Sequence, residues 1–241
     1  MQSHITDSLK KMQMGWAHCS RNMWITAASN AVRSIEHRIS FPSAASADGV
    51  IESIVLAAMS MECFINELVI HLDLDQLTGC NPRPTELVNT ASLVSMLEKN
   101  NARALSKYRA ASIVLGGNVL CDGSEPLQSA QQLNDLRNEL VHLKPKATNN
   151  PGKAHGAVVD LFNRGYCINK PGDKDVLAGW YFQIQSPQVA KWACRSAFNL
   201  IWHIAEQLEK VARPHHCAWI FTDHVRFGWQ SHKQHFIDLW R

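Results

Sequence analysis

The sequence carries little excess charge of either sign. Its 24 Lys and Arg residues against 21 Asp and Glu residues leave a formal net charge of +3. A strongly basic nucleic-acid arm and an acidic disordered tail are therefore both excluded, because each depends on a large one-sided charge. Contact with RNA remains open only through a local basic patch.

The sequence also lacks paired cysteines. Its seven cysteines are widely scattered, and no two of them form a Cys-x-x-Cys pair. A disulfide framework or a zinc ribbon needs closely paired cysteines, so we expect reduced thiols, a cytoplasmic location and no bound metal. The sequence contains nothing typical of a phosphate-binding loop or of a dinucleotide-binding fold, and we expect no cofactor.

Neither a signal peptide nor a membrane span is predicted. Two lysines near the N-terminus are not followed by the apolar run that a signal peptide requires. The most apolar stretch, from Val50 to Leu72, contains three glutamates and an asparagine. We therefore expect a core helix there and no contact with a membrane.

Apolar residues make up 46% of the chain and charged residues 19%, which is typical of a globular protein. Apolar side chains recur every three or four positions, and this spacing predicts helices over 16–39, 50–72, 85–97, 102–115, 127–143 and 186–212. Thr85 and Ser124 are predicted helix N-caps. Several helices with short connections favour an all-α antiparallel bundle.

The segment 146–185 departs from this pattern. Asn-Pro-Gly and Pro-Gly sequences mark turns, and apolar side chains alternate over 176–184 as in a strand. We predict a small excursion here that holds a short helix and a β-hairpin. The whole chain, 1–241, is expected to be one helical domain, with 146–185 as an insertion and 214–241 as an aromatic, histidine-rich tail.

The helix predicted over 127–143 gathers three polar side chains of different chemistry. At 100° per residue its leucines share one side, whereas Asn138 and His142 lie one turn apart on the opposite side. Arg137 lies on the flank between the two sides, where its long side chain can reach either. A cation, an amide and an imidazole are therefore close together. A solvated helix end of this composition needs no function, since a histidine there also meets the helix dipole favourably.

The string Arg137-Asn138-Glu139-Leu140-Val141-His142 resembles the R-x(4–6)-H motif of the HEPN superfamily, including its polar residue directly after the arginine. The stretch from Ala57 to Leu68 resembles the HEPN helix that carries an acidic residue and an asparagine, here Glu62 and Asn66. The resemblance covers about residues 20–145, and the helix over 186–212 fits as a further element of the bundle.

This resemblance implies a helical domain that dimerises through its motif helices, and a metal-independent endoribonuclease that serves as a toxin or antiphage effector. By the same resemblance, His142 is the general acid and base, Arg137 stabilises the charge on the reacting phosphate, and Asn138 orients that phosphate. Glu62 positions Arg137, and Asn66 supports the site.

The resemblance leaves further partners and one alternative function open. Lys144 and Lys146, directly after the motif, are expected to contact RNA, and an antitoxin or regulatory protein is an expected partner. The alternative is a non-catalytic HEPN-like module that binds RNA or another protein.

The tail over 214–241 interleaves basic and aromatic residues and holds five histidines. Its composition suits single-stranded RNA binding. It equally suits aromatic side chains that pack onto the bundle or across a dimer, and packing is favoured because large apolar side chains gain most from burial. No second ligand pair stands at a spacing typical of zinc, so we do not expect a metal there.

Overall fold

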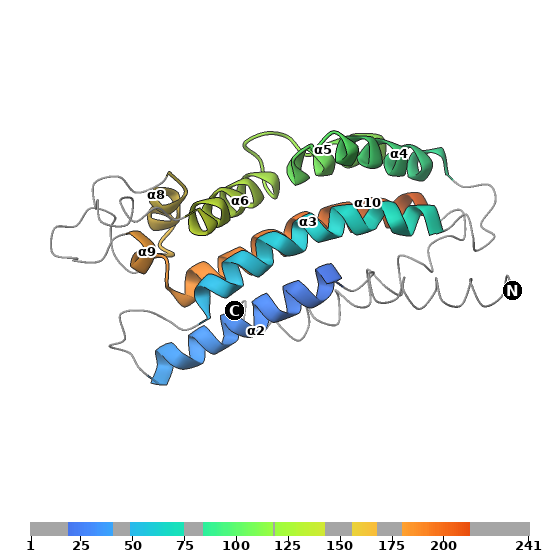
Figure 1. Cartoon of the computed structure of the whole chain (residues 1–241). Coiled ribbons are helices and arrows are strands. Elements are labelled where there is room, and N and C mark those ends of the chain that lie inside the picture. Colours follow the sequence, from blue (N-terminus) through green and yellow to red (C-terminus); the bar gives the residue numbers. More distant parts are fainter. Residues whose placement is uncertain are drawn as a thin grey trace, which may run out of the picture. The chain divides into compact units, whose positions relative to one another are not determined.

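The computed structural model describes residues 19–40, 49–74, 84–117, 119–142, 156–167 and 180–212. These residues form an all-α helical bundle, and no strand occurs among them (Figure 1). The predicted fold class is confirmed. In chain order the helices are α2 (Cys19–Ser40), α3 (Val50–Leu74), α4 (Thr85–Lys99), α5 (Ala104–Val114), α6 (Leu127–Val141), α8 (Gly156–Asn163), α9 (Trp180–Gln183) and α10 (Pro187–Ala212).

The described residues group into two compact units. Unit 1 comprises the described residues of 19–23, 59–127 and 199–212, and unit 2 those of 24–58 and 128–198. Helices α2, α3 and α10 contribute residues to both units. Each unit is described by itself below, and the single domain expected over 1–241 stays a prediction.

Helix α10 follows the predicted pattern most closely. Its start is capped by Ser186, whose hydroxyl oxygen accepts a hydrogen bond from the Val189 backbone N–H at 3.2 Å. Within unit 2, the indole N–H of Trp24 in α2 donates to the Cys194 carbonyl at 3.0 Å. The Trp24 ring also lies 5.5 Å from that of Phe198. The apolar stripe predicted on this helix is buried except for the half-buried Val211; its buried members are Val189, Trp192, Ala193, Ala197, Leu200, Ile201, Ile204, Ala205 and Leu208.

The start of α3 approaches α2 closely within unit 2. Gly49 has a positive φ of 81°, and a Cβ atom there would lie 2.9 Å from the carbonyl oxygen of Asn30. One turn later, the Ser53 hydroxyl donates to the Ala27 carbonyl at 2.9 Å. Glycine is required at this position both for its backbone conformation and for the space that a side chain would occupy.

In unit 1, the middle of α3 packs against α5. The buried Tyr108 hydroxyl donates to the Met61 carbonyl at 2.9 Å, and the Tyr108 ring stacks on Phe64 with centroids 6.4 Å apart. The start of α4 differs from the prediction by one residue. Pro84 occupies the N-cap position and its carbonyl accepts from the Leu87 N–H at 3.1 Å, so Thr85 is the first helical residue rather than the cap.

The ends of α6 also differ slightly from the prediction. The Ser124 hydroxyl donates to the Cys121 carbonyl at 2.8 Å within the preceding turn, and α6 begins only at Leu127, so Ser124 is not its N-cap. The helix ends at Val141 rather than at 143, and His142 lies in the turn that follows.

The excursion contains helix where the sequence predicted a strand. The predicted short helix is present as α8, but Trp180–Gln183 forms the helix α9, so the strand is wrong over these residues. Positions 176–179 lie outside the described residues. The pattern of burial explains why this segment is a helix. The buried side chains are those of Trp180, Gln183 and Ile184, whereas Phe182 is 46% exposed. Spacings of three and four mark one helical turn, which apolar alternation had concealed.

Helix α3 is the described helix whose length and apolar composition would suffice to cross a membrane. The core helix of a globular protein passes the same test. Hydrogen bonds join α3 to α2 and α5, as described above, and its apolar side chains Ile54, Met61, Ile65 and Leu68 are buried. The expectation of a core helix without membrane contact stays a prediction.

Candidate functional site

Helix α6 has a buried apolar side and a more exposed polar side that carries Arg137, Asn138 and His142, as the sequence predicted. On its apolar side Leu127, Ala130, Leu133 and Leu136 are buried, whereas Leu140 is half-buried. Arg137 and Asn138 are half-buried and His142 is exposed. The His142 backbone N–H donates to the Asn138 carbonyl at 3.0 Å, so the helical backbone continues as far as the histidine. The motif therefore lies on the accessible side of a well-anchored helix, within unit 2.

Within the motif, the arginine and the asparagine are hydrogen-bonded to each other. Arg137 Nη1 donates to Asn138 Oδ1 at 2.9 Å. Because the amide oxygen faces the guanidinium, the amide nitrogen of Asn138 remains as a donor toward a ligand. The planar fork of a guanidinium suits two oxygens of one phosphate. The pair offers N–H donors, which is the chemistry that an anion requires.

Neighbouring contacts fix the position of α6 in unit 2. Gln132 Nε2 donates to Asp160 Oδ2 of α8 at 2.9 Å, and Gln131 Nε2 donates to Asp135 Oδ1 at 2.9 Å along the helix. At the end of α6, the side chain of Val141 is 55% exposed directly beside His142. An apolar side chain thus accompanies the imidazole at the solvent boundary.

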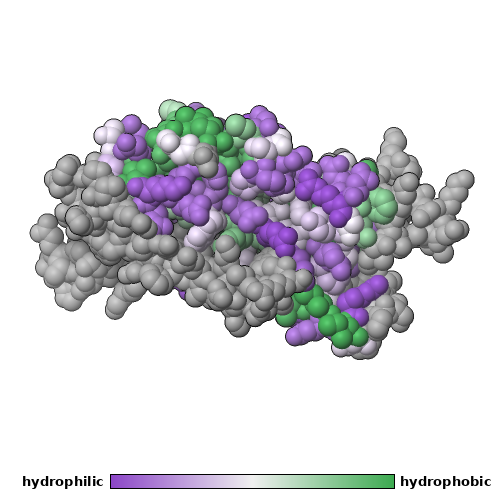
Figure 2. All heavy atoms as spheres, turned by 180° about the vertical axis from the view of Figure 1, so that it is seen from behind, coloured by the Kyte–Doolittle hydropathy of each residue, from purple (hydrophilic) through white to green (hydrophobic). Residues whose placement is uncertain are grey.

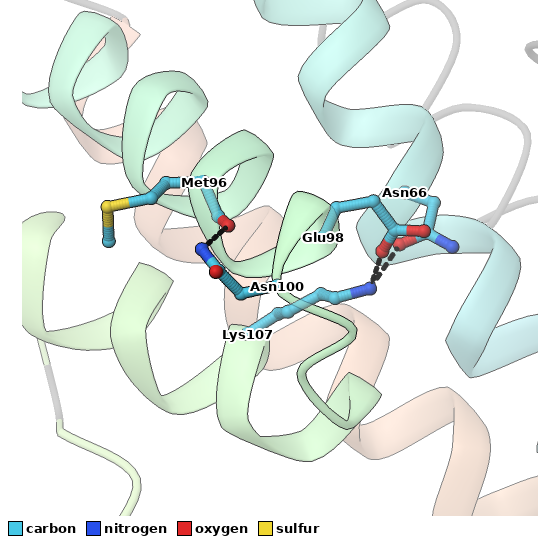
Figure 3. A network of polar contacts seen from close by, with 5 residues as sticks. All are labelled: Asn66, Met96, Glu98, Asn100 and Lys107. Atoms are coloured by element: carbon cyan, nitrogen blue, oxygen red, sulfur yellow. Dashed lines mark hydrogen bonds and ion pairs between the residues drawn. The ribbon is translucent and has the colours of Figure 1, made fainter.

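The two supporting residues predicted on α3 belong to a different polar cluster. Asn66 Oδ1 accepts a hydrogen bond from Lys107 Nζ at 2.9 Å, and the same ammonium forms an ion pair with Glu98 (Figure 3). Asn66 is half-buried and Glu62 is exposed. Figure 3 shows the lysine of α5 reaching between α3 and α4, so the network joins three helices of unit 1.

Burial governs the electrostatics of this network. Lys107 is only 4% exposed. Desolvation lowers the pKa of Lys107, and the negative charge of Glu62 opposes that shift. Sequence reasoning missed this lysine: it lies among buried side chains of α5, and its partner Glu98 is on the preceding helix, so local periodicity carries no signal of the pairing.

The remaining predicted site residues fall into two groups. Lys144, Lys146 and the tail 214–241 lie outside the described residues. Glu62 belongs to unit 1 and Arg137 to unit 2, so the predicted positioning of Arg137 by Glu62 stays a prediction.

Buried thiols do not offer a nucleophile at neutral pH. Burial raises the pKa of Cys63, Cys167 and Cys194 to about 12, so each is protonated under physiological conditions. Among the described residues, no three His, Cys, Asp or Glu side chains gather where they could hold a metal ion. Within unit 2, Arg137, Asn138 and His142 therefore form the candidate site.

The surface carries apolar side chains in local patches. Figure 2 shows one face on which hydrophilic side chains predominate and apolar ones gather in places. Of the described residues in unit 2, those with large exposed apolar side chains are Ile39, Val141, Val159 and Phe182. Val141 is the member of this set that directly precedes His142.

Comparison of the chain with protein-family models, with curated proteins and with solved structures finds no match. The function is therefore inferred from the residues and their geometry.

Proposed function

We propose that this protein is a metal-independent endoribonuclease of the HEPN type, which acts as a homodimer with a composite Arg/His site. The observation that carries the proposal is the end of α6. There a half-buried arginine, hydrogen-bonded to the adjacent asparagine, is followed about one and a half turns later by an exposed histidine. The resemblance of this string to the HEPN motif supplies the reaction class.

In the proposed reaction, the ribose 2′-hydroxyl attacks the adjacent phosphorus and the 5′-oxygen of the next nucleotide leaves. His142 takes the proton from the 2′-hydroxyl or gives one to the leaving oxygen. An imidazole suits both tasks because its ordinary pKa lies near neutrality. The exposure of His142 leaves it open to a polymeric substrate.

Arg137 and Asn138 hold the phosphate in this scheme. Negative charge builds on the non-bridging oxygens in the transition state, and donors aimed at those oxygens supply a large share of catalysis. The hydrogen bond between the two side chains fixes the guanidinium before the substrate binds. Glu62 would position Arg137, Asn66 would support the site, and Lys144 and Lys146 would bind flanking phosphates.

A dimer supplies what one motif lacks. One imidazole cannot take a proton from the attacking oxygen and simultaneously give one to the leaving oxygen, so two copies of His142 are needed to do both. Two-fold symmetry brings the same helix from each subunit to one axis. The exposed Val141 beside His142 offers apolar contact for such an interface. The biological role proposed is that of a toxin or antiphage effector under the control of an antitoxin or regulatory protein.

A matched pair of asparagines on α6 tests the proposal. Asn138→Ala should slow RNA cleavage by about 10²-fold or more, as expected for the loss of one transition-state hydrogen-bond donor. Asn134→Ala, one turn earlier on the same helix, should leave the rate unchanged. Equal rates for both variants, measured on single-stranded RNA in EDTA with the oligomeric state checked by sedimentation, would sink the catalytic role of the motif.

The second candidate function is a non-catalytic module that binds RNA or a protein. It is favoured by the hydrogen bond between Arg137 and Asn138, because that bond is formed without substrate and serves binding as well as catalysis. This candidate predicts that the wild-type chain retains RNA in a filter-binding assay without cutting it, and that His142→Ala binds equally well.

A further inference from the structure

A cluster of three sulfur atoms lies in unit 1, between the start of α2 and the middle of α3. The Cys63 thiol donates a hydrogen bond to Met23 Sδ at 3.5 Å. Burial raises the pKa of Cys63, and the nearby Cys19 thiol raises it further. Cys19 and Met23 are one turn apart on α2, so their side chains lie on the same side of that helix. The cluster is reachable from solvent, because Cys19 is exposed and Cys63 is half-buried.

The spacing of these sulfurs is close to that of metal ligands. Two sulfurs that bind one ion at about 2.3 Å lie about 3.8 to 4.0 Å apart in tetrahedral or trigonal geometry. The observed 3.5 Å between Cys63 Sγ and Met23 Sδ needs an adjustment of only a few tenths of an ångström. Two thiols and a thioether form a soft ligand set, which suits Cu(I) better than the harder divalent ions.

Side chains around the sulfur cluster join α2 to α3 and carry negative charge that favours a bound cation. The Ser20 backbone N–H and hydroxyl donate to the buried Glu67 carboxylate at 3.1 and 2.5 Å, one residue from Cys19 and one turn from Cys63. Glu62 and Glu67 both act electrostatically on the Cys63 thiol. Nearby negative charge opposes a bare thiolate but attracts a positive ion.

We propose that Cys19, Met23 and Cys63 form a binding site for a single Cu(I) ion. On binding, Cys19 and Cys63 each release a proton to solvent and form a Cu–S bond, and Met23 adds its thioether without losing a proton. No electron is transferred, because the ion enters as Cu(I). The site lies in unit 1 and shares no residue with the proposed ribonuclease site.

The test is an anaerobic titration of the full-length chain with Cu(I), supplied as its bicinchoninate complex. Wild-type protein should remove one equivalent of Cu(I) from the coloured chelator, and the affinity should rise with pH because two protons are released. Cys19→Ser and Cys63→Ser should abolish this equivalent. Met23→Leu should weaken it by about tenfold to a hundredfold, the loss that removal of one supporting partner of a metal site typically causes.

Two controls separate this site from other ligands in the chain. Cys121→Ser removes an exposed cysteine outside the cluster and should leave the tight equivalent intact. A variant that carries His216→Ala and Cys217→Ser should also retain it. Undiminished binding in Cys63→Ser, loss in the tail variant, or Zn²⁺ binding that is as tight and unaffected by Met23→Leu would each overturn the proposal. If Cys63→Ser does not fold, the exposed position of Cys19 allows Cys19→Ser to decide the question.

Discussion

Lys107 of unit 1 and Arg137 of unit 2 each pair a cation with an asparagine side chain, yet their settings differ. Lys107 is 4% exposed, and its ammonium bonds to Asn66 and Glu98 from two other helices. Arg137 is half-buried and bonds to its own neighbour Asn138, beside an exposed histidine. The buried Lys107 ammonium is bound by carboxylate and amide oxygens and joins helices. The Arg137 guanidinium and the His142 imidazole lie nearer the surface, where they can contact a substrate.

We therefore expect the Lys107 cluster to serve mainly stability and the Arg137 cluster to serve the proposed reaction. A buried ion pair adds little net stability, because desolvation offsets the Coulomb attraction, but breaking it leaves a polar group without its partner. A half-exposed arginine can be replaced at small cost to folding. Variants of the two cations should therefore divide cleanly between stability and activity.

The largest effect is expected from Arg137→Ala. Loss of its charge and fork should lower the rate of RNA cleavage by about 10²–10³-fold, while the free energy of unfolding changes by about 0.5 kcal/mol or less. Arg137→Lys keeps the charge without the fork and should restore only part of the rate. Single-turnover cleavage together with urea denaturation measures both quantities. A stability loss as large as the loss of activity would erase the distinction.

The next largest effect is expected from Lys107→Ala. Removing the buried stem and the ammonium should lower the free energy of unfolding by about 2 kcal/mol, less than for a fully buried pair, because Glu98 is half-exposed. Cleavage per folded molecule should stay at the wild-type level at a temperature well below the transition. A Lys107 variant that folds normally and loses cleavage would place this network in the active machinery instead.

Lys107→Met should have a smaller effect. Methionine fills a similar volume and removes the charge whose burial lowers the pKa of Lys107. Because the desolvation cost disappears with the charge, the free energy of unfolding should lie within about 1 kcal/mol of wild type. Thermal denaturation of Lys107→Met beside Lys107→Ala measures how much of the loss is due to the cavity. Equal losses in both would show that the charge itself stabilises unit 1.

The smallest effect is a pH dependence centred on Glu67, which ties α2 to α3 in unit 1. Burial raises the pKa of Glu67 above its ordinary 4.5, and the hydrogen bonds from Ser20 only partly oppose this. The folded state therefore keeps a proton that the unfolded state loses, so this group's contribution to stability falls as the pH rises from about 4.5. Glu67→Gln should flatten that part of the pH profile in urea denaturation. An unchanged slope would contradict the assignment.

The helices and the two-sided nature of α6 could be predicted from the sequence, because both follow from local periodicity. The start predicted for the helix over 186–212 also agrees with the structure, in which the Ser186 hydroxyl caps α10 three residues away. The contacts of Lys107 were not, because they depend on the packing of α5 against helices that lie far from it in sequence. The strand predicted through Trp180 was wrong because Trp180, Gln183 and Ile184 are buried together, which is the spacing of one helical turn. The alternation of apolar residues in the sequence does not show this.

The most direct test of the central claim is cleavage of single-stranded RNA by the purified wild-type chain and by His142→Ala, side by side in EDTA. The proposed chemistry predicts that the wild-type dimer cuts RNA and leaves 2′,3′-cyclic phosphate ends. It also predicts that His142→Ala, with its fold and dimer intact, is slower by about 10²–10⁴-fold. Intact RNA after incubation with a high concentration of folded wild-type dimer would contradict it.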